Sequence, residues 1–180
     1  METFIDNVKN NNYDELLKYV GKKITYMDLK DNNLTMCIGN IPDILMIDIL
    51  NNTSKLYIEK SNIIKELCYY STPEIIKYII DKGVNLEVET NYKWRPIHFV
   101  CRYSTPEIIK YLIDKGVNLE VEDNEKKRPI HYICRYSTPE IIKYVVDKGV
   151  NLEAETIYKW RPIHYVCCYS TQKNYKISYR

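Results

Sequence analysis

The feature that most constrains the fold is a 19-residue segment that occurs three times at a spacing of 33 residues. It reads STPEIIKYIIDKGVNLEVE from Ser71, STPEIIKYLIDKGVNLEVE from Ser104 and STPEIIKYVVDKGVNLEAE from Ser137. Only three of its 19 positions vary, and each exchange keeps an apolar residue. A second element, KWRPIHFVCRY from Lys93, recurs with few changes from Lys126 and Lys159. A repeat of this length predicts a stack of small modules, each of which contacts only its neighbours.

Each repeat carries the signals of two short helices. In the second helix, the sequence Ser-Thr-Pro-Glu from Ser104 supplies a cap, a proline suited to the first helical position, and the glutamate of a capping box. The apolar residues that follow form one stripe, and Gly116 is expected to end the helix in the left-handed conformation. The first helix begins near Pro96 and places its inner face at Ile97, Val100 and Cys101. Because only three residues separate the two helices, we expect an antiparallel helical hairpin.

A period of 33 with two helices and an extended connector resembles the ankyrin repeat. The family signature Thr-Pro-Leu-His-x-Ala is matched by Arg-Pro-Ile-His-Phe-Val from Arg95, and Gly-Ala-Asp-Val-Asn is matched by Gly-Val-Asn-Leu-Glu from Gly116. Tetratricopeptide repeats are longer, at about 34 residues, and lack the glycine-terminated connector. In style the chain is similar to ankyrin proteins that giant amoeba-infecting DNA viruses of the mimivirus type encode in many copies. The resemblance implies an all-α ankyrin-repeat solenoid with extended, β-hairpin-like connectors.

The resemblance reaches weaker copies at both ends and implies one domain over residues 1–180. Residues 1–29 resemble a degenerate pair of helices, at Phe4–Lys9 and Tyr13–Val20, and residues 30–56 resemble a degenerate repeat around Pro42. The strong repeats are residues 57–89, 90–122 and 123–155. Residues 156–180 form a truncated repeat, because the proline and the Ile-Ile stripe are lost after Thr171. Degenerate end units are typical of solenoids, whose ends face solvent.

Composition and charge argue against several classes of protein. The chain is 45% hydrophobic and 28% charged, and a net charge of +2 without a basic block gives no case for a dedicated nucleic-acid or membrane-surface binder. The longest apolar run, residues 38–50, is interrupted by Pro42 and is too short to cross a bilayer. The first ten residues lack the pattern of a secretory signal. We therefore expect an intracellular protein, in the cytoplasm of a host cell, whose six cysteines are reduced.

The three histidines, His98, His131 and His164, each precede a cysteine by three residues. A metal site and a Cys/His nucleophilic pair are the two chemical hypotheses that this spacing raises. Each repeat supplies only two ligands, and equivalent residues of stacked repeats lie roughly 8–10 Å apart, too far for one zinc ion or a disulfide. We therefore expect no metal, no cofactor and no catalysis, with histidines that hydrogen-bond between neighbouring turns, as in the family. Buried thiols, where the family has alanine, are expected at Cys37, Cys68, Cys101, Cys134 and Cys167.

The resemblance also implies where a partner binds, namely at the turn tips and the exposed side of the first helices. Carried over by position, the predicted partner-binding residues are Asn91, Tyr92, Trp94, Arg102, Tyr103, Asn124, Glu125, Lys127, Arg135, Tyr136, Ile157, Tyr158, Trp160 and Tyr169. Tryptophan, tyrosine and arginine are the types enriched in binding hot spots. Two structural alternatives stay open: the tryptophans shield the hairpin base by stacking on Arg95 and Arg161, and the tyrosines at positions 70, 103, 136 and 169 pack between helices.

The connectors depart from the family at two positions in every copy. Arginine replaces the threonine before proline, so the usual hydroxyl cap of the first helix is absent, at Arg95, Arg128 and Arg161. Lysine replaces the turn glycine, at Lys93, Lys126 and Lys159. Both changes leave the conformation of the turn tips open.

Together these patterns predict a monomeric, non-catalytic module that binds an unidentified protein partner, such as a host protein. We expect no membrane association and no small-molecule substrate. Single-stranded nucleic-acid binding is an alternative, because aromatic and basic residues alternate at Tyr92–Arg95 and Tyr158–Arg161. A second alternative is a degenerate paralogue without activity of its own, which the loss of pattern after Thr171 indicates.

Overall fold

The computed structural model describes residues 1–54 and 63–177, and over these ranges the chain forms short helices with no strand. The chain divides into two compact units, Met1–Asn85 and Leu86–Arg180. None of the helices described is long and apolar enough to cross a membrane. The prediction of an all-α fold built from short helices is confirmed.

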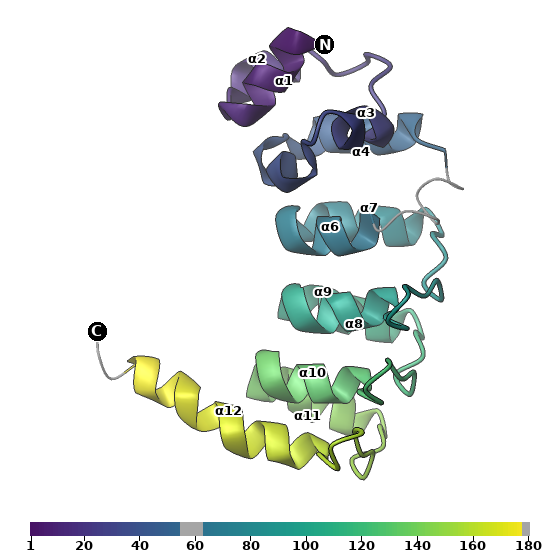
Figure 1. Cartoon of the computed structure of the whole chain (residues 1–180), viewed down its shortest axis with the longest axis vertical. Helices are drawn as coiled ribbons and strands as arrows, with labels where there is room; N and C mark the ends of the chain where they lie inside the picture. Colours follow the sequence, from purple (N-terminus) through teal and green to yellow (C-terminus); the bar gives the residue numbers. More distant parts are fainter. Residues whose placement is uncertain (55–62, 178–180) are drawn as a thin grey trace. The chain divides into compact units, whose positions relative to one another are not determined.

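In the first unit, consecutive helices pack against one another in contacting pairs (Figure 1). The helices are α1 (Glu2–Lys9), α2 (Tyr13–Leu17), α3 (Tyr26–Asp31), the 3-10 helix η1 (Thr35–Asn40), α4 (Asp43–Asn52), α6 (Ile63–Tyr70) and α7 (Pro73–Asp81). Helix α1 contacts α2 and η1, η1 contacts α6, and α4 contacts α7. The core runs through all of these elements, from Phe4 and Val8 to Ile75 and Ile79. The predicted helix pair near the amino terminus is confirmed, with α2 ending at Leu17 rather than Val20.

Helix α3 is an element that the repeat pattern did not predict. It begins with a capping box, in which Thr25 Oγ1 accepts from the Asp28 amide at 3.3 Å and the Asp28 carboxylate accepts from the Thr25 amide at 2.6 Å. Its residues Tyr26 and Leu29 are fully buried. The helix spans the predicted boundary between residues 29 and 30, and the boundary at 56/57 lies outside the described residues. The repeat boundaries therefore stay a prediction.

The second unit contains the strong repeats of residues 90–122 and 123–155 and the carboxyl-terminal helix (Figure 1). Its helices are α8 (Pro96–Tyr103), α9 (Pro106–Asp114), α10 (Pro129–Tyr136), α11 (Pro139–Asp147) and α12 (Pro162–Ile177). Helices α8 and α9 form one hairpin, and α10 and α11 form the next. The first helices pack side by side in the order α8, α10, α12, and the second helices α9 and α11 pack beside each other. This arrangement places the turn tips and first helices of successive repeats next to one another.

The ends of the second helices follow the local sequence, with one correction at the start. Each begins with its proline, and Gly116 and Gly149 take positive φ values of 79° and 80° just beyond the carboxyl ends, as predicted. The predicted hydroxyl cap of α9 is wrong. The carbonyl oxygen of Thr105 accepts the Ile108 and Ile109 amides at 3.1 Å, and its buried hydroxyl has no partner among the described residues.

Helix α12 is a single helix of 16 residues, whereas α8 and α10 have eight residues each. The shorter helices end where Ser-Thr-Pro begins the turn, because proline disfavours a helical residue before it. Gln172 stands in place of that proline, so the helix continues to Ile177. Within the described residues no further repeat packs on α12, and Cys167 and Ile163 are exposed. The prediction that Cys167 fills the core is therefore wrong, whereas Cys68, Cys101 and Cys134 are buried as predicted and Cys37 is half-buried.

The buried histidines connect each first helix to the next repeat. His98 Nδ1 accepts from the Arg95 amide at 3.0 Å, and its Nε2 lies 3.3 Å from the carbonyl oxygen of Val121. His131 repeats this arrangement with Arg128 at 2.9 Å and Ala154 at 3.1 Å. Burial lowers the pKa of both imidazoles. The predicted role is confirmed for His98 and His131, whereas His164 is exposed and its Nδ1 accepts from the Arg161 amide at 2.9 Å. In all three copies Nδ1 thus accepts from the amide of the arginine that precedes the helix.

Candidate functional site

The turn tips keep a closed conformation although lysine replaces glycine. Lys93 has a φ of 56°, and the other two tip lysines, Lys126 and Lys159, have 55° and 61°. In the first tip the Thr90 hydroxyl accepts from the Trp94 amide at 3.1 Å, and the Thr90 amide donates to the Trp94 carbonyl at 2.9 Å. The tip therefore depends on Thr90, which the sequence analysis did not single out. The available signal was a short polar residue three positions before each tip lysine, at Thr90, Asp123 and Thr156.

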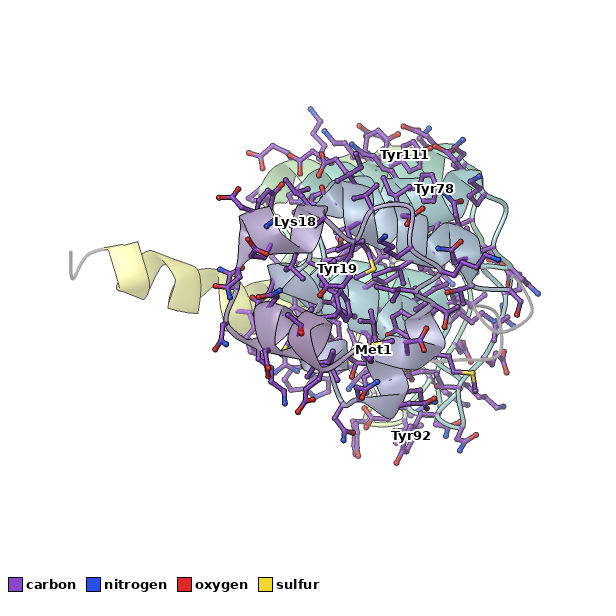
Figure 2. The ribbon with its side chains drawn as sticks, turned by 90° about the horizontal axis from the view of Figure 1, so that it is seen from above. Met1, Lys18, Tyr19, Tyr78, Tyr92 and Tyr111 are labelled. Carbon is purple, nitrogen blue, oxygen red and sulfur yellow. The ribbon has the colours of Figure 1, made fainter. Side chains whose placement is uncertain are left out.

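Successive tips are joined by backbone hydrogen bonds. The Asn124 amide donates to the Tyr92 carbonyl at 3.1 Å, and the Ile157 amide donates to the Glu125 carbonyl at 3.0 Å. The side chains at these positions point outward: Tyr92 is 72% exposed and Tyr158 is 66% exposed. In Figure 2, Tyr92 lies at the outer edge, on the opposite side of the view from Tyr111 of α9. The tips thus form a continuous edge whose side chains face solvent.

The tryptophans pack on aromatic residues, not on the arginines beside them. The Trp94 ring lies 4.9 Å from the ring of Phe99 and 4.9 Å from that of Tyr132, and the Trp160 ring lies 5.2 Å from that of Tyr165. The alternative that the tryptophans stack on Arg95 and Arg161 is therefore wrong, because they pack on the rings of Phe99, Tyr132 and Tyr165 instead. Trp160 remains exposed.

Arg95, Arg128 and Arg161 each bind two glutamates of the preceding connector instead. Arg95 forms ion pairs with Glu87 at 2.8 Å and Glu89 at 2.7 Å. Arg128 repeats the pairing with Glu120 and with Glu122, and Arg161 with Glu153 and Glu155. Glutamates two residues apart lie on the same side of an extended chain, which brings both within reach of one guanidinium. These three arginines therefore hold the connectors.

The middle of the three turn tips, residues 123–127, has different side chains from the other two. Asp123 is 5% exposed, and its Oδ1 accepts from the amides of Glu125 at 2.8 Å and Lys127 at 2.9 Å. Its Oδ2 accepts from the Tyr132 hydroxyl at 2.5 Å. Lys127, at the position of Trp94, forms an ion pair with Glu125. Desolvation lowers the pKa of Lys127, but Glu125 and the neighbouring charges outweigh it and the net pKa is raised. Lys127 is thus engaged within the tip.

Arginine and aromatic side chains alternate along the first helices α8, α10 and α12. The Arg102 guanidinium lies over the rings of Tyr103, Trp94 and Tyr136, at 4.9, 5.4 and 5.6 Å. The Arg135 guanidinium lies over the rings of Tyr136 and Tyr169, at 5.0 and 4.4 Å. We call this set the stacked row, and it consists of Trp94, Arg102, Tyr103, Tyr136, Arg135 and Tyr169.

The structure therefore sorts the predicted residues into two neighbouring groups. Six of them form the stacked row. The tip edge holds Asn91, Tyr92, Asn124, Glu125, Ile157 and Tyr158, and the Asn124 side chain also donates to the Asn91 carbonyl at 3.3 Å. Trp160 connects to the stacked row through Tyr165, whose ring is stacked on that of Tyr169 at 6.4 Å. Lys127 belongs to neither group, because its side chain forms an ion pair with Glu125 of the same tip.

Two of the buried thiols are held in their protonated form. Burial raises the pKa of the Cys68 and Cys134 thiols to about 12, so both are protonated at neutral pH. A thiol is a poor nucleophile in that state. Within the described residues, no group of three or more metal-ligating side chains comes together.

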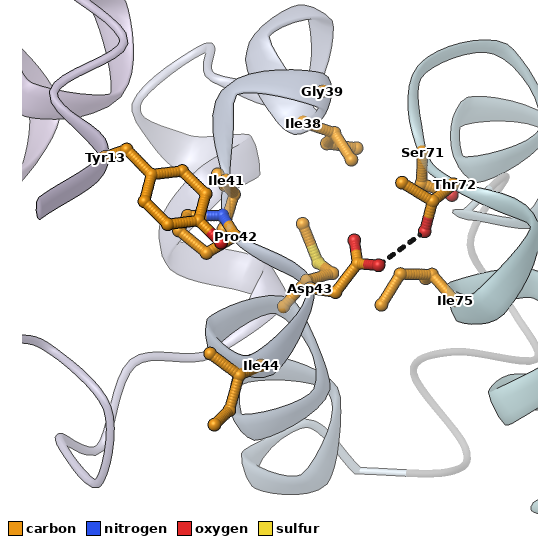
Figure 3. Close-up of a pocket in the computed structure, with 11 residues that line it drawn as sticks. Tyr13, Ile38, Gly39, Ile41, Pro42, Asp43, Ile44, Ser71, Thr72 and Ile75 are labelled. Carbon is orange, nitrogen blue, oxygen red and sulfur yellow. Dashed lines mark hydrogen bonds between the residues drawn. The ribbon is translucent and has the colours of Figure 1, made fainter. Parts of the chain in front are cut away.

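A pocket of 360 Å³ lies in the first unit, between η1 with α4 and the start of α7 (Figure 3). It is lined by apolar side chains such as Ile41 and Ile75, and Asp43 accepts a hydrogen bond from the Thr72 hydroxyl at 2.9 Å beside it. None of the predicted partner-binding residues lines it. With its one carboxylate already paired, the pocket offers no set of convergent polar groups.

Comparison with known families gives a match over most of the chain. The model of a family described as ankyrin repeats (3 copies) matches residues 8–123 and, in overlap, residues 64–156. A comparison with curated proteins gave no match. The family match agrees with the paired helices, the buried histidines and the glycines that end the second helices. The chain belongs to the ankyrin-repeat family.

Proposed function

We propose that this chain is a non-catalytic module that binds a partner protein through the tip edge and the stacked row of residues 86–180. Ankyrin repeats are generally protein–protein interaction modules, and the family is generally non-enzymatic. The observation that carries the proposal is the stacked row, in which two arginines and several aromatic rings lie side by side on the first helices.

The stacked row has the physical properties of a binding hot spot. Tryptophan, tyrosine and arginine contribute most to binding energy when they are buried against a partner. Each guanidinium is held between rings, so less side-chain entropy is lost when a partner binds. The backbone bonds between tips fix the adjacent edge in the same way. Such a surface can bind with little rearrangement.

Single-stranded nucleic-acid binding has less support. That alternative needs free aromatic and basic side chains at the tips, yet Arg95 is paired with two glutamates and Trp94 packs on Phe99 and Tyr132. Tyr92 and Lys93 are the exposed remainder of that tip. Base stacking requires an accessible ring face, and the faces in the stacked row lie under arginines.

The setting of this activity is part of the same proposal. From the resemblance to the ankyrin proteins of giant viruses, we propose a viral origin, a place in the cytoplasm of the host cell, a monomeric state and a host protein as partner. A degenerate paralogue without activity predicts that no partner depends on the tip edge or the stacked row.

The test uses the full chain as bait against a displayed library of protein fragments. Each selected fragment is then measured against the variant Tyr92→Ala/Tyr158→Ala/Trp160→Ala by fluorescence anisotropy. We expect a loss of affinity of at least about tenfold, because exposed aromatic anchors contribute most of the binding energy. The control is Tyr13→Ala, which removes an exposed ring of the first unit and is expected to change nothing. Equal affinity for the wild type and the triple variant, with unchanged circular dichroism, contradicts the proposal.

A further inference from the structure

The arginines of residues 86–177 fall into two sets with different partners. Arg95, Arg128 and Arg161 each form ion pairs with two glutamates. Arg102 and Arg135 form no ion pair with any carboxylate in the described part of the chain and lie over aromatic rings instead. A guanidinium carries five N–H donors and stays charged at any physiological pH. We call Arg102 and Arg135 the arginine pair.

Stacking leaves the donors of the arginine pair available. Neither guanidinium donates a hydrogen bond to another group in the described part of the chain, so the five N–H donors of each remain available. Both residues are half-buried, so part of each remains in contact with solvent. A planar edge with parallel N–H donors matches a carboxylate, which it can bind through two hydrogen bonds.

The spacing within the arginine pair defines the ligand further. Both guanidiniums lie over the Tyr136 ring, whose centre is 5.6 Å from that of Arg102 and 5.0 Å from that of Arg135. The two guanidiniums therefore lie no more than roughly 11 Å apart, and side chains at positions i and i+2 of an extended chain lie on the same side, roughly 7 Å apart. Carboxylates at positions i and i+2 of an extended peptide fall within this distance.

We propose that the arginine pair binds an extended acidic segment of the partner protein, with one carboxylate on each guanidinium in the pattern Glu-x-Glu or Asp-x-Asp. The proposal rests on the proposed function and names the chemistry of its partner. Charge supports it, because residues 86–180 carry 16 Lys and Arg against 12 Asp and Glu. Such an excess attracts acidic segments and speeds their association.

The neighbourhood of the arginine pair favours a carboxylate partner over a nucleic acid. Glu125, the acidic residue of the middle tip, is bound to Lys127 and so does not compete for the pair. Phosphates would also satisfy the guanidiniums, but a nucleic acid gains much of its affinity from bases stacked on ring faces. The rings of Tyr103, Tyr136 and Tyr169 already carry arginines on a face.

The first measurement compares labelled peptides on the full chain by fluorescence anisotropy. Twelve-residue peptides of Gly, Ser and Tyr carry two glutamates at i and i+2, two at i and i+1, or two glutamines at i and i+2. We expect the i, i+2 glutamate peptide to bind at least about tenfold more tightly than the glutamine peptide, because each charge-assisted hydrogen bond pair contributes to affinity. The adjacent-glutamate peptide is expected to fall between them. A single-stranded RNA of 12 nucleotides completes the set.

The second measurement uses variants matched in charge and in repeat position. Arg102→Gln/Arg135→Gln is expected to abolish the preference for the i, i+2 glutamate peptide. Lys110→Gln/Lys143→Gln removes the same charge from exposed residues of α9 and α11, also 33 positions apart, and is expected to keep that preference. Arg102→Lys/Arg135→Lys keeps the charge but loses the planar edge, so an intermediate preference is expected. Circular dichroism verifies that each variant is folded.

Several outcomes overturn the inference. These are equal binding of the glutamate and glutamine peptides, an unchanged preference in Arg102→Gln/Arg135→Gln, an equal loss in the lysine control, or tighter binding of the RNA than of any peptide. Library fragments separate this inference from the proposed function. Fragments that need Tyr92, Tyr158 and Trp160 but bind Arg102→Gln/Arg135→Gln as tightly as wild type overturn the arginine pair and leave the proposed function standing. Fragments that need neither set overturn both.

Discussion

The outer and middle turn tips of residues 86–180 reach the same backbone conformation with different side chains. The outer tips are Thr90–Trp94 and Thr156–Trp160, and the middle tip is Asp123–Lys127. All three have a lysine with a φ between 55° and 61°, and each closes with a hydrogen bond from its first amide to its last carbonyl. The hydroxyl of the outer tips and the carboxylate of the middle tip accept from equivalent amides. A threonine and an aspartate at the first position of the tip thus support the same backbone conformation.

The threonine and the aspartate differ in the contacts that they make with the helix beneath the tip. In the first outer tip, Trp94 covers the ring of Phe99. In the middle tip, Lys127 replaces the tryptophan, and Tyr132 replaces the phenylalanine and donates to Asp123. Asp123 with a phenylalanine below would lose a donor to its buried carboxylate. The second outer tip has Thr156 with Tyr165 at the equivalent position, so the aspartate, and not the tyrosine, sets the middle tip apart from both outer tips. The middle tip is therefore a coupled polar unit, in which Asp123 gives the hydroxyl of Tyr132 a charged acceptor.

The largest effect is expected from removing the carboxylate of the middle tip. Asp123→Ala leaves the Tyr132 hydroxyl and two tip amides without their acceptor, which we expect to lower the free energy of unfolding by about 3 kcal/mol. Urea unfolding followed by tryptophan fluorescence measures this directly, because both tryptophans lie in residues 86–180.

Thr90→Ala is the matched change in an outer tip. It removes an acceptor from two amides but strands no buried hydroxyl, since Phe99 lies below it. We expect a loss of about 1 kcal/mol. Equal losses for the two variants would show that the tips differ in sequence alone and not in energetics.

A smaller effect is expected from the other half of the same hydrogen bond. Tyr132→Phe removes the hydroxyl that donates to Asp123 and is expected to cost about 1–2 kcal/mol. Asp123→Thr/Tyr132→Phe gives the middle tip the threonine and the phenylalanine of the first outer tip. Its loss of unfolding free energy should be smaller than the sum of the losses of Asp123→Thr and Tyr132→Phe. Urea unfolding of the two single variants and the double variant gives this coupling free energy. Additive losses would contradict the coupled unit.

The sequence allows the second helices to be predicted because their signals are local. Proline at the first position, the apolar stripe and a glycine with positive φ each act within one turn of the chain. Helix α12 shows the same rule by its exception, since the loss of one proline lengthens the helix. The burial of a cysteine depends instead on a neighbouring repeat, and none packs over Cys167 within the described residues. Position within a repeat predicts burial only where the next repeat covers it.

The candidate site was harder to predict because its contacts cross between elements. Asp123 and Tyr132 are nine residues apart, in a turn and a helix, and no local pattern connects them. The signal was the joint change of two repeat positions in one copy, at Asp123 and Lys127, because the tyrosine at position 132 recurs at Tyr165 in the next copy. One of the open alternatives placed Arg95 under Trp94, its neighbour in sequence. The alternating glutamates of the connector, which share one side of an extended chain, were the better guide to its partner.

The smallest expected effect is on the pH dependence of the middle tip. Burial, and then the hydrogen bond to Asp123, raise the pKa of Tyr132 above its usual value near 10. As the pH rises above that value, the unfolded chain releases the phenol proton before the folded chain does, so stability falls with pH. The stability difference between wild type and Tyr132→Phe should therefore shrink above pH 10, by at most about 1.4 kcal/mol per pH unit. Urea unfolding at pH 8, 9.5 and 10.5 measures it. Asp123→Thr/Tyr132→Phe also lacks this phenol and should respond to pH as Tyr132→Phe does; a constant difference from wild type across this range would mean that Tyr132 does not couple folding to its proton.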